Sequence, residues 1–268
     1  MKTILILLIL AFAAMGCSRT IPELKYELVP YSGDLKVERF DSTITDENRF
    51  NYNNEIYSVG SAFTYTYQYY TKDGKPRNYQ YLEEGWEFTE AKDSDRNEIT
   101  LGVKSGLKPM IDWIPDYNQT LVSYQPSNKA SFEMTGLIEN EANIWMHPPR
   151  DGLFRILQLS PYPSVMYPLK VGKEWEWLFQ VGSHYGDERW ATWDGNITIT
   201  TNNEITGTQV METSWGELET WTIEAEAISE IGTTSMKAVF NDSLGFLKMN
   251  FTNIDGSKFK FELGEVDM

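Results

Sequence analysis

The sequence predicts an all-β fold: an antiparallel meander curled into a barrel, a half-barrel or a two-sheet sandwich, with at most short helices. Aromatic and β-branched residues alternate with polar ones at period two, which is the spacing of a strand with one buried face. The turn dipeptide Asp-Gly recurs at 73–74, 151–152, 194–195 and 255–256, and it favours tight hairpin turns. No long stretch combines a helical period with strong helix formers. Hairpins between neighbouring strands therefore build the predicted sheet.

The predicted strands follow one another at short intervals. The first carries a stripe of apolar and aromatic residues, which consists of Tyr57, Val59, Phe63, Tyr65, Tyr67 and Tyr69. A hairpin around 254–256 holds the last. Between them, the predicted strands span 97–103, 120–124, 131–135, 175–181, 197–201, 205–212, 219–229 and 234–240. Two segments are ambiguous: glycine and proline interrupt residues 98–118, and residues 151–160 suit either a short helix or a buried strand.

Two hairpins allow the strand register to be predicted. A three-residue loop at 254–256 makes one face of the hairpin wholly apolar, and it gives Gly256 the left-handed conformation that such a loop needs. The predicted pairs are Phe251 with Phe259, Met249 with Phe261 and Leu247 with Leu263. The same kind of loop at 72–74 predicts pairs of Tyr67 with Tyr79 and Tyr65 with Tyr81.

The first residues predict export. Lys2 is followed by an apolar run at 4–14, which is too short to cross a bilayer as a permanent helix and is typical of a secretory signal. The run ends in Ala-Met-Gly-Cys at 14–17, and this resembles the bacterial lipobox, in which a cysteine receives diacylglycerol before cleavage. Cys17 is the only cysteine of the chain, so it cannot form an internal disulfide. Lipidation explains why an exported protein keeps it.

The chain is accordingly divided into three parts. Residues 1–16 are the predicted lipoprotein signal peptide, residues 17–33 the lipidated cysteine with its tether, and residues 34–268 the β domain. Prolines stiffen the middle of that domain, because the residue before each proline is held extended. We expect residues 144–168 to form a structural seam where two sub-sheets join, between a tyrosine-rich first half and a tryptophan-rich second half.

The resemblance to bacterial lipoproteins also implies a location. Ser18 stands where an aspartate would resemble the signal for retention in the inner membrane. Residues 18–21 lack the acidic cluster that marks surface export in lipoproteins of the Bacteroidetes type. Both features favour the bacterial cell envelope, with the lipid in the outer membrane and the domain facing the periplasm. The predicted membrane contact is made through the lipid on Cys17.

The net charge limits the partners. Removing the signal peptide takes away Lys2, so the formal charge of −16 becomes −17 in the mature chain if the lipidated amine is uncharged. So acidic a surface argues against nucleic acid and against docking on anionic head groups. A glycan, an apolar ligand or an envelope protein remains as the partner.

Three stretches of the C-terminal half carry a family resemblance. They are VGKEWEW at 171–177, ITGTQVMETSWGELETWTIEAEA at 205–227 and SLGFLKMNFTNIDGSKFKFEL at 243–263. This part of the chain resembles uncharacterised lipoproteins of Bacteroidetes and, more remotely, an all-β family of exported proteins of unknown function. The resemblance implies an all-β exported domain and brings no catalytic residue with it.

The motifs for common chemistries are absent from the sequence. There is no Gly-x-Ser-x-Gly elbow, no Walker or Rossmann glycine loop and no HExxH-like metal motif around the two histidines, His147 and His184. A single cysteine excludes cysteine-based zinc sites. We therefore predict no catalytic residue, no metal and no cofactor.

Aromatic residues are the strongest indication of a binding site. The chain has nine tryptophans and fifteen tyrosines, which suit stacking on sugar rings or the lining of an apolar pocket. The competing interpretation assigns most of them to the sheet core. The candidate ligand-binding residues are Trp145, His147, Arg150, Trp190 and Trp193, the last two being the aromatics expected to lie exposed.

Two functions are open at this point. The favoured one is a non-catalytic, lipid-anchored envelope module that binds a glycan, an apolar ligand or a protein partner. The alternative is a saccharide hydrolase that uses paired carboxylates near His147, with Arg150 positioning the substrate. The alternative needs His147 beside a carboxylate in an open cleft. Contact of His147 with backbone carbonyls alone would argue against it.

Overall fold

The computed structural model describes residues 25–83, 85–91, 97–107, 114, 117–127 and 132–268. Cys17 and the predicted signal peptide lie outside these residues. The described chain is all-β with three short 3-10 helices, which confirms the predicted fold class. Its elements are β1 (Tyr26–Ser32), β2 (Leu35–Phe40), η1 (Arg49–Asn51), β3 (Ala62–Tyr70), β4 (Pro76–Leu82), β5 (Gly85–Glu90), β6 (Glu98–Val103), β7 (Thr120–Pro126), β8 (Glu133–Glu139), β9 (Asn143–Met146), η2 (Gly152–Leu159), β10 (Ser164–Met166), β11 (Glu174–Gly182), η3 (Ser183–Tyr185), β12 (Asn196–Thr213), β13 (Gly216–Ser229), β14 (Gly232–Asn241), β15 (Gly245–Thr252) and β16 (Lys258–Asp267).

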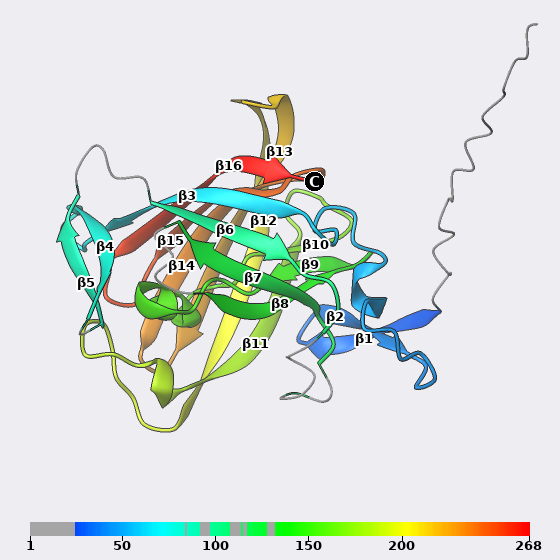
Figure 1. Ribbon diagram of the computed structural model, residues 1–268, viewed down its shortest axis with the longest axis horizontal. Coiled ribbons are helices and arrows are strands. Elements are labelled where there is room, and N and C mark those ends of the chain that lie inside the picture. Colours follow the sequence, from blue (N-terminus) through cyan, green and yellow to red (C-terminus); the bar gives the residue numbers. More distant parts are fainter. Residues whose placement is uncertain (1–24, 84, 92–96, 108–113, 115–116, 128–131) are drawn as a thin grey trace, which may run out of the picture.

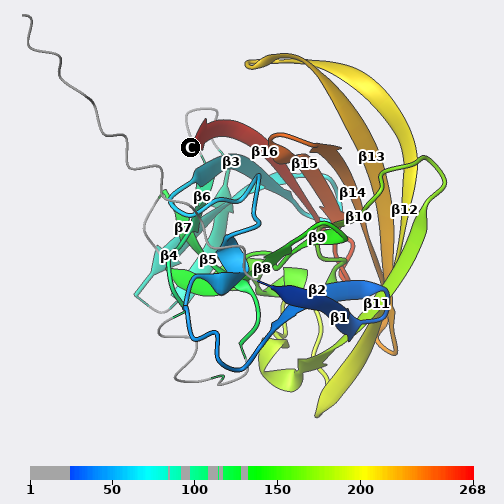
Figure 2. The ribbon, with the colours of Figure 1, turned by 90° about the vertical axis from the view of Figure 1, so that its right-hand side faces the viewer.

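One antiparallel sheet forms the body of the protein (Figure 1). Its strand order is β10-β9-β8-β7-β6-β3-β16-β15-β14-β13-β12-β11, with β4 and β5 as a side branch from β3. The sheet curls into a nearly closed barrel, so its two edge strands, β10 and β11, approach each other (Figure 2). The indole Nε1 of Trp175 on β11 donates a hydrogen bond to Ser164 Oγ on β10, at 3.0 Å.

The two halves of the chain are joined at the pair β3–β16, where Tyr67 faces Phe261 and Tyr69 faces Phe259. Residues 144–168 do not join two sub-sheets as expected. They hold β9, helix η2 and the edge strand β10 of one continuous sheet. Because β10 and β11 are consecutive in the chain but lie at opposite edges, this segment runs beside the opening of the barrel.

Helix η2 fills the interior of the barrel, and the short-helix interpretation of residues 151–160 is therefore right. Every residue of η2 except Arg155 is buried. The ring of Phe154 lies 5.0 Å from that of Tyr67 and 5.5 Å from that of Phe259, so it contacts both halves of the sheet. The carboxylate of Asp151 accepts a hydrogen bond from Gly152 N at 2.8 Å and caps the helix.

The predicted register is confirmed at the last hairpin, where Phe251 pairs with Phe259, Met249 pairs with Phe261 and Gly256 has φ +81°. At the hairpin of residues 72–74 the turn is in the predicted register, but the ladder ends after Tyr69–Arg77 and Tyr70–Pro76. The expected pairs Tyr67–Tyr79 and Tyr65–Tyr81 do not form. The reason is competition: β3 already has β16 on one side and takes β6 on the other, so β4 turns away to pair with β5.

The folded body begins earlier than expected. Strand β1 lies within residues 17–33, the range predicted as the tether, and it forms a hairpin with β2. The aliphatic side chains of Leu35 and Val37 on β2 are 0% and 3% exposed. This hairpin lies beside the opening between the two sheet edges (Figure 2).

Candidate functional site: an aromatic hollow at the sheet opening

The β1–β2 hairpin binds both sides of the opening, at the edge strand β11 and at β9, the neighbour of the edge strand β10. On the β11 side, Asp34 N donates to Glu176 O at 2.8 Å, and Glu176 N donates to the Asp34 carboxylate at 2.9 Å. Leu178 N donates to Ser32 Oγ at 3.1 Å. On the β9 side, Lys36 N donates to the side-chain oxygen of Asn143 at 2.8 Å. The hairpin thus pairs polar backbone groups that an open strand edge would leave free.

Gly33 at the hairpin tip makes this approach possible. Its φ is +57°, and a Cβ at this position would lie 2.3 Å from Glu176 O. Any side chain would therefore collide with the backbone of β11 in addition to straining a left-handed conformation. The contact between the hairpin and the sheet edge depends on a residue without a Cβ.

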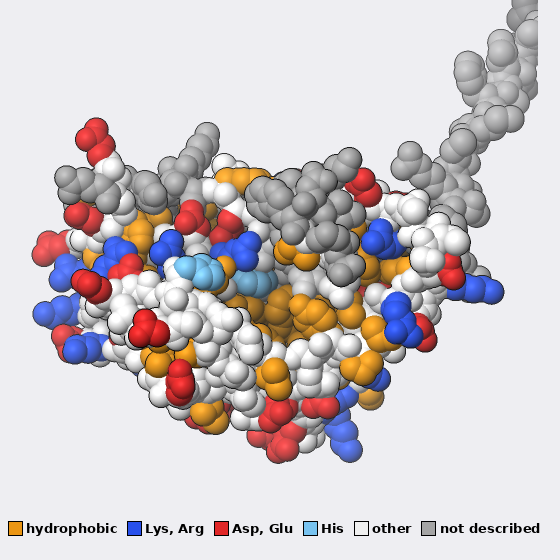
Figure 3. All heavy atoms as spheres, turned by 90° about the horizontal axis from the view of Figure 1, so that it is seen from below, with side chains coloured by type: hydrophobic (Ala, Val, Ile, Leu, Met, Phe, Trp, Pro, Cys, Tyr) orange, Lys and Arg blue, Asp and Glu red, His pale blue; other side chains and the backbone are white. Residues whose placement is uncertain are grey.

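Five aromatic rings gather beside this opening. We call the cluster the aromatic hollow, and its members are Tyr31, Trp145, Tyr162, Trp177 and Phe179. The ring of Trp145 lies 5.6 Å from Tyr162, 5.8 Å from Trp177 and 6.2 Å from Tyr31. Tyr162 lies 4.7 Å from Phe179. Figure 3 shows a hollow on this side of the molecule, with apolar side chains on its floor and histidine at one end.

The rings come from three strands and from the loop between η2 and β10, which holds Tyr162, and their exposure differs. Tyr31 belongs to the hairpin and is 41% exposed, Phe179 of β11 is half-buried, and Trp145 of β9 is 5% exposed. Tyr31 is held in place because its hydroxyl accepts a hydrogen bond from Gln119 Nε2 at 2.8 Å. The hollow therefore has a buried aromatic floor and an exposed aromatic wall.

Several buried donors in and near the hollow have no hydrogen-bond partner in the described part of the chain. They are the indole Nε1 atoms of Trp145 and Trp177 and the hydroxyl of Tyr117. Burial raises the pKa of Tyr117, so its hydroxyl stays protonated and remains a donor. A buried donor without a partner costs about 1–3 kcal/mol.

His147 lies against the hollow, and within the described residues none of its contacts is with an acidic side chain. Its ring is 4.7 Å from Tyr162 and 6.0 Å from Trp145. Its Nδ1 lies 2.7 Å from Pro148 O, so Nδ1 carries the proton and donates to this carbonyl. Burial lowers the pKa of His147 to about 3, and the charge of Arg150 acts in the same direction. The imidazole is therefore neutral near pH 7.

Arg150 is held by strand β8. Its backbone N donates to Glu133 Oε1 at 2.8 Å, and its Nη2 donates to Met134 O at 2.9 Å. The guanidinium Nε is 4.0 Å from the second oxygen of Glu133. Burial raises the pKa of Glu133 to about 7 despite these contacts. Sequence reasoning missed Glu133, since nothing distinguishes it from other polar residues of alternating strands.

The structure brings together Trp145, His147 and Arg150, three of the predicted ligand-binding residues. It places the other two elsewhere. Trp190 is stacked on Trp86 of β5, with ring centroids 6.0 Å apart, and Trp193 donates through Nε1 to Val181 O at 3.3 Å. Both are half-buried. Both residues lie in the loop between η3 and β12, as expected, but the expectation that they are exposed is wrong, because each ring packs against the sheet or its side branch.

Two negative findings concern the described residues. Within them, no group of three or more His, Cys, Asp or Glu side chains could hold a metal ion. No helix among them has both the length and the apolar character needed to span a bilayer.

Comparison with known proteins gives remote likenesses only. No family model and no curated protein matches the chain. The YmcC lipoprotein of Escherichia coli K12, described as hypothetical, matches with a TM-score of 0.37 and 9% identity, over 85% of this chain and 99% of that one. An exported protein of Bacteroides fragilis with a YmcC-like fold matches at 0.41 and 11%, over 82% and 99%. A lipoprotein of Parabacteroides distasonis matches at 0.43 and 8%, over 79% and 97%. The predicted remote resemblance is confirmed, and at this distance it carries no ligand or activity across.

Proposed function

We propose that the protein is a non-catalytic, lipid-anchored protein of the bacterial cell envelope that binds a saccharide in the aromatic hollow. The lipid is placed on Cys17, because the lipobox-like residues 14–17 end in the only cysteine of the chain. Ser18 and the lack of an acidic cluster at 18–21 favour the outer membrane, with the domain facing the periplasm. Tyr26, the first residue of β1, then follows the anchor after a short segment.

The aromatic hollow is the observation that carries the binding proposal. The C–H faces of sugar rings stack on aromatic side chains, and their hydroxyl groups accept and donate hydrogen bonds. The hollow offers stacking surface, since Tyr31 is 41% exposed and the ring of Phe179 is half-buried. Arg150 supplies a cation in an otherwise acidic protein.

The alternative, hydrolysis of a saccharide, finds little support in this geometry. Neutral His147 donates to a backbone carbonyl and has no carboxylate among its contacts. Glu133 has the raised pKa of a general acid, but its oxygens are occupied by Arg150. Asp151, the neighbouring carboxylate, caps helix η2. Binding without catalysis requires no change in these contacts of His147, Glu133 and Asp151.

Titration calorimetry with a panel of envelope-type glycans tests the binding proposal. We expect Tyr31→Ala to weaken binding about tenfold, because one exposed stacking surface is lost. Trp215→Ala is the matched control, since Trp215 is 38% exposed at the far tip of the β12–β13 hairpin and should leave affinity unchanged. Lack of binding to every glycan, or equal affinity of the Tyr31 variant and the wild type, would overturn the proposal.

Metabolic labelling with a fatty acid tests the anchor separately. The wild-type chain should take up label and fractionate with membranes, whereas Cys17→Ala should do neither. Equal labelling of both chains would refute lipidation at this cysteine. The glycan experiment does not depend on lipidation of Cys17, so it can be interpreted whatever the labelling experiment shows.

A further inference from the structure

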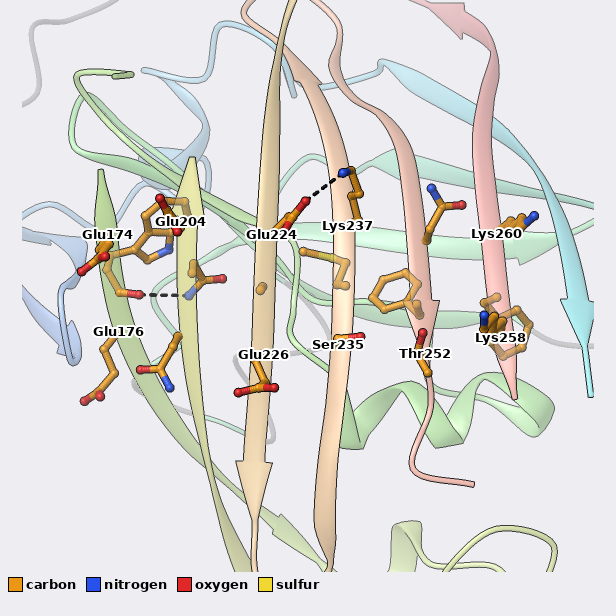
Figure 4. A pocket seen from close by; sticks show the side chains of 18 of the residues that line it. Glu174, Glu176, Glu204, Glu224, Glu226, Ser235, Lys237, Thr252, Lys258 and Lys260 are labelled. Atoms are coloured by element: carbon orange, nitrogen blue, oxygen red, sulfur yellow. Dashed lines mark hydrogen bonds and ion pairs between the residues drawn. The ribbon is translucent and has the colours of Figure 1, made fainter. Parts of the chain in front are cut away.

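The outer face of the sheet carries two rows of polar residues that run straight across the strands from β11 to β16 (Figure 4). Successive register partners define them. The first row is Glu174, Glu204, Glu224, Lys237, Asn250 and Lys260. The second is Glu176, Asn202, Glu226, Ser235, Thr252 and Lys258. We call these the polar rows. They line a groove of about 1060 Å³.

The polar rows are electrically divided. The three strands β11 to β13 contribute all of the glutamates, and the three strands β14 to β16 contribute all of the lysines. The acidic half and the basic half meet at Glu224 and Lys237, whose side chains form an ion pair of 2.8 Å. The surface therefore has one negative end and one positive end.

Most of these charges are unpaired. Glu174 directly faces Glu204, and Glu204 directly faces Glu224, although like charges opposite one another destabilise a sheet. Among the described residues, neither Glu174 nor Glu204 forms an ion pair, and neither does Lys258. The ammonium group of Lys260 lies 4.9 Å from the centroid of the Tyr70 ring. In the part of the chain that the structure describes, the ion pair of Glu224 with Lys237 is the only one within the polar rows.

We infer that the polar rows are an interface between two copies of this chain. A two-fold axis that lies parallel to the strands, between β13 and β14, places the acidic half of each copy over the basic half of the other. Such an isologous contact is self-complementary and closed. A two-fold axis perpendicular to the strands would set acid against acid, so the charge pattern selects one orientation.

The geometry of stacked sheets allows these contacts. Sheets pack face to face at about 10 Å, which the long side chains of glutamate and lysine span from both sides. The next row of the same face holds Leu178, Thr200 and Ile228, which are successive register partners on β11, β12 and β13. Leu178 and Ile228 are apolar and are 45% and 44% exposed. They provide apolar contact at the border of the charged area.

The charge balance distinguishes a second copy from other partners. A nucleic acid or an anionic membrane would be repelled by the glutamates, and a basic partner would be repelled by Lys258 and Lys260. A second copy satisfies both halves at once. The chosen axis also leaves Tyr26 of both copies at the same end of the pair along the axis, which suits two chains attached to one membrane. The aromatic hollow takes no part in this contact.

Charge exchange tests the inference. One variant combines Glu174→Lys with Glu204→Lys, and the other combines Lys258→Glu with Lys260→Glu. A zero-length carboxyl–amine cross-linker is applied to the full chain in nonionic detergent, with ¹⁴N and ¹⁵N copies mixed so that intermolecular links are recognised by mass. The wild type should give links between peptides of β11–β13 and of β14–β16. Each variant alone should lose about tenfold of the linked dimer, because like charges then face each other, and an equal mixture of the two variants should recover it.

A matched control separates this contact from general attraction between charged chains. Glu212 and Glu217 are exposed and face each other on the protruding end of the β12–β13 hairpin, away from the polar rows. The combination of Glu212→Lys with Glu217→Lys should leave the links of the wild type unchanged. Absence of intermolecular links in the wild type, links that map outside the polar rows, or failure of the mixture to recover the dimer would overturn the inference. Sedimentation of each variant as a folded species confirms that a lost link is not a lost fold.

Discussion

The two halves of the sheet are buried in different ways. In the half formed by β7 to β10, neighbouring residues of one strand are buried on both faces: Leu121 and Val122 are 1% and 0% exposed. In β13, of the other half, burial alternates, and Ile223 at 0% contrasts with Ile228 at 44%. The cause is a second layer, since Leu121 packs with Phe50, Leu107 and Tyr117, while Val122 belongs to the main core.

This difference separates the two candidate surfaces. The doubly covered half has little bare sheet face, and the proposed binding site lies at the edge, where the β1–β2 hairpin meets β9 and β11. The singly covered half keeps an open face, which displays the polar rows. A ligand at the edge meets aromatic rings, and a partner at the open face meets charges.

The largest effect is expected where the two halves share one side chain. Phe154→Ala should lower the free energy of unfolding by about 3–5 kcal/mol, because the ring of Phe154 contacts Tyr67, Phe259 and Phe261 inside the barrel and no neighbour can fill its volume. Urea denaturation measures it. The control is Phe132→Ala, since Phe132 is 57% exposed. Similar losses in both variants would show that η2 does not hold the halves together.

The double covering of β7 predicts that both faces of that strand are sensitive. Leu121→Ala and Val122→Ala should each lower the free energy of unfolding by about 2 kcal/mol or more, since each side chain leaves a cavity in a different cluster. Chemical denaturation of the two single variants checks this. If only one of these neighbours were sensitive, β7 would be an ordinary alternating strand.

The hairpin that bridges the opening depends on Gly33. Gly33→Ala should destabilise the protein by about 2 kcal/mol, because a left-handed conformation is strained for alanine and the new Cβ meets Glu176 O. Amide exchange of Glu176 and Leu178 should increase in the variant, since these groups bond to the hairpin. The control is Gly74→Ala, at a similar φ of +77° with nothing within 4 Å of its Cβ. Unchanged exchange at Glu176 would mean that the hairpin does not protect the edge.

The pKa of His147 predicts a pH effect at the same opening. The folded state holds this imidazole neutral down to about pH 3, whereas the unfolded chain binds a proton near the ordinary value of 6.5. Stability from this group is therefore present above pH 6.5 and is lost as pH falls toward 3, by at least about 1 kcal/mol. His147→Asn should flatten this part of the profile. The raised pKa of Glu133 makes the free energy of unfolding fall as pH rises between 4.5 and about 7, which is the opposite trend. Both proteins contain Glu133, so its contribution cancels when the two pH profiles are subtracted.

The smallest effect is expected on the bare face of the other half. At concentrations where the chain is monomeric, Ile228→Thr should change the free energy of unfolding by less than about 0.5 kcal/mol, because Ile228 is exposed on the outer face of β13 in a single copy. Ile223→Thr, the same change on the inner face of the same strand, should be clearly destabilising. Thermal unfolding of this matched pair in dilute solution measures the contrast. Equal losses in the monomer would mean that burial does not alternate along β13.

The alternating half was the easier one to predict. Period-two patterns located β11 and β13 to β16, and one apolar face fixed the register of Phe251 with Phe259. The same patterns predicted two strands, at 197–201 and 205–212, where the structure has the single strand β12, whose register shifts between Ile205 and Gly207. The doubly buried half has near-continuous apolar strands such as β9, Asn-Ile-Trp-Met at 143–146, whose pattern does not show which face is inner. The length of the Tyr67–Tyr79 ladder could not be predicted either, because it depends on β6 and β16 competing for β3.

The site was predicted in part. Trp145, His147 and Arg150 lie near one another in the sequence, and a proline-stiffened segment kept them together in space. Tyr31, Tyr117 and Phe179 reach the same place from distant segments, and only the closing of the sheet brings them there. Trp190 was misjudged, because its stacking partner Trp86 is on another element, more than a hundred residues earlier in the chain.

The position of the β1–β2 hairpin has a mechanical consequence. In a chain anchored through Cys17, any pulling force between the membrane and the body enters at Tyr26 and reaches the sheet through this hairpin. The first bonds to bear the load are those of Ser32 and Asp34 to β11 and of Lys36 to Asn143, on opposite sides of the opening. The side chain of Tyr31 moves with the same hairpin. Tension on the anchor would therefore be felt at the wall of the aromatic hollow before it reached the core.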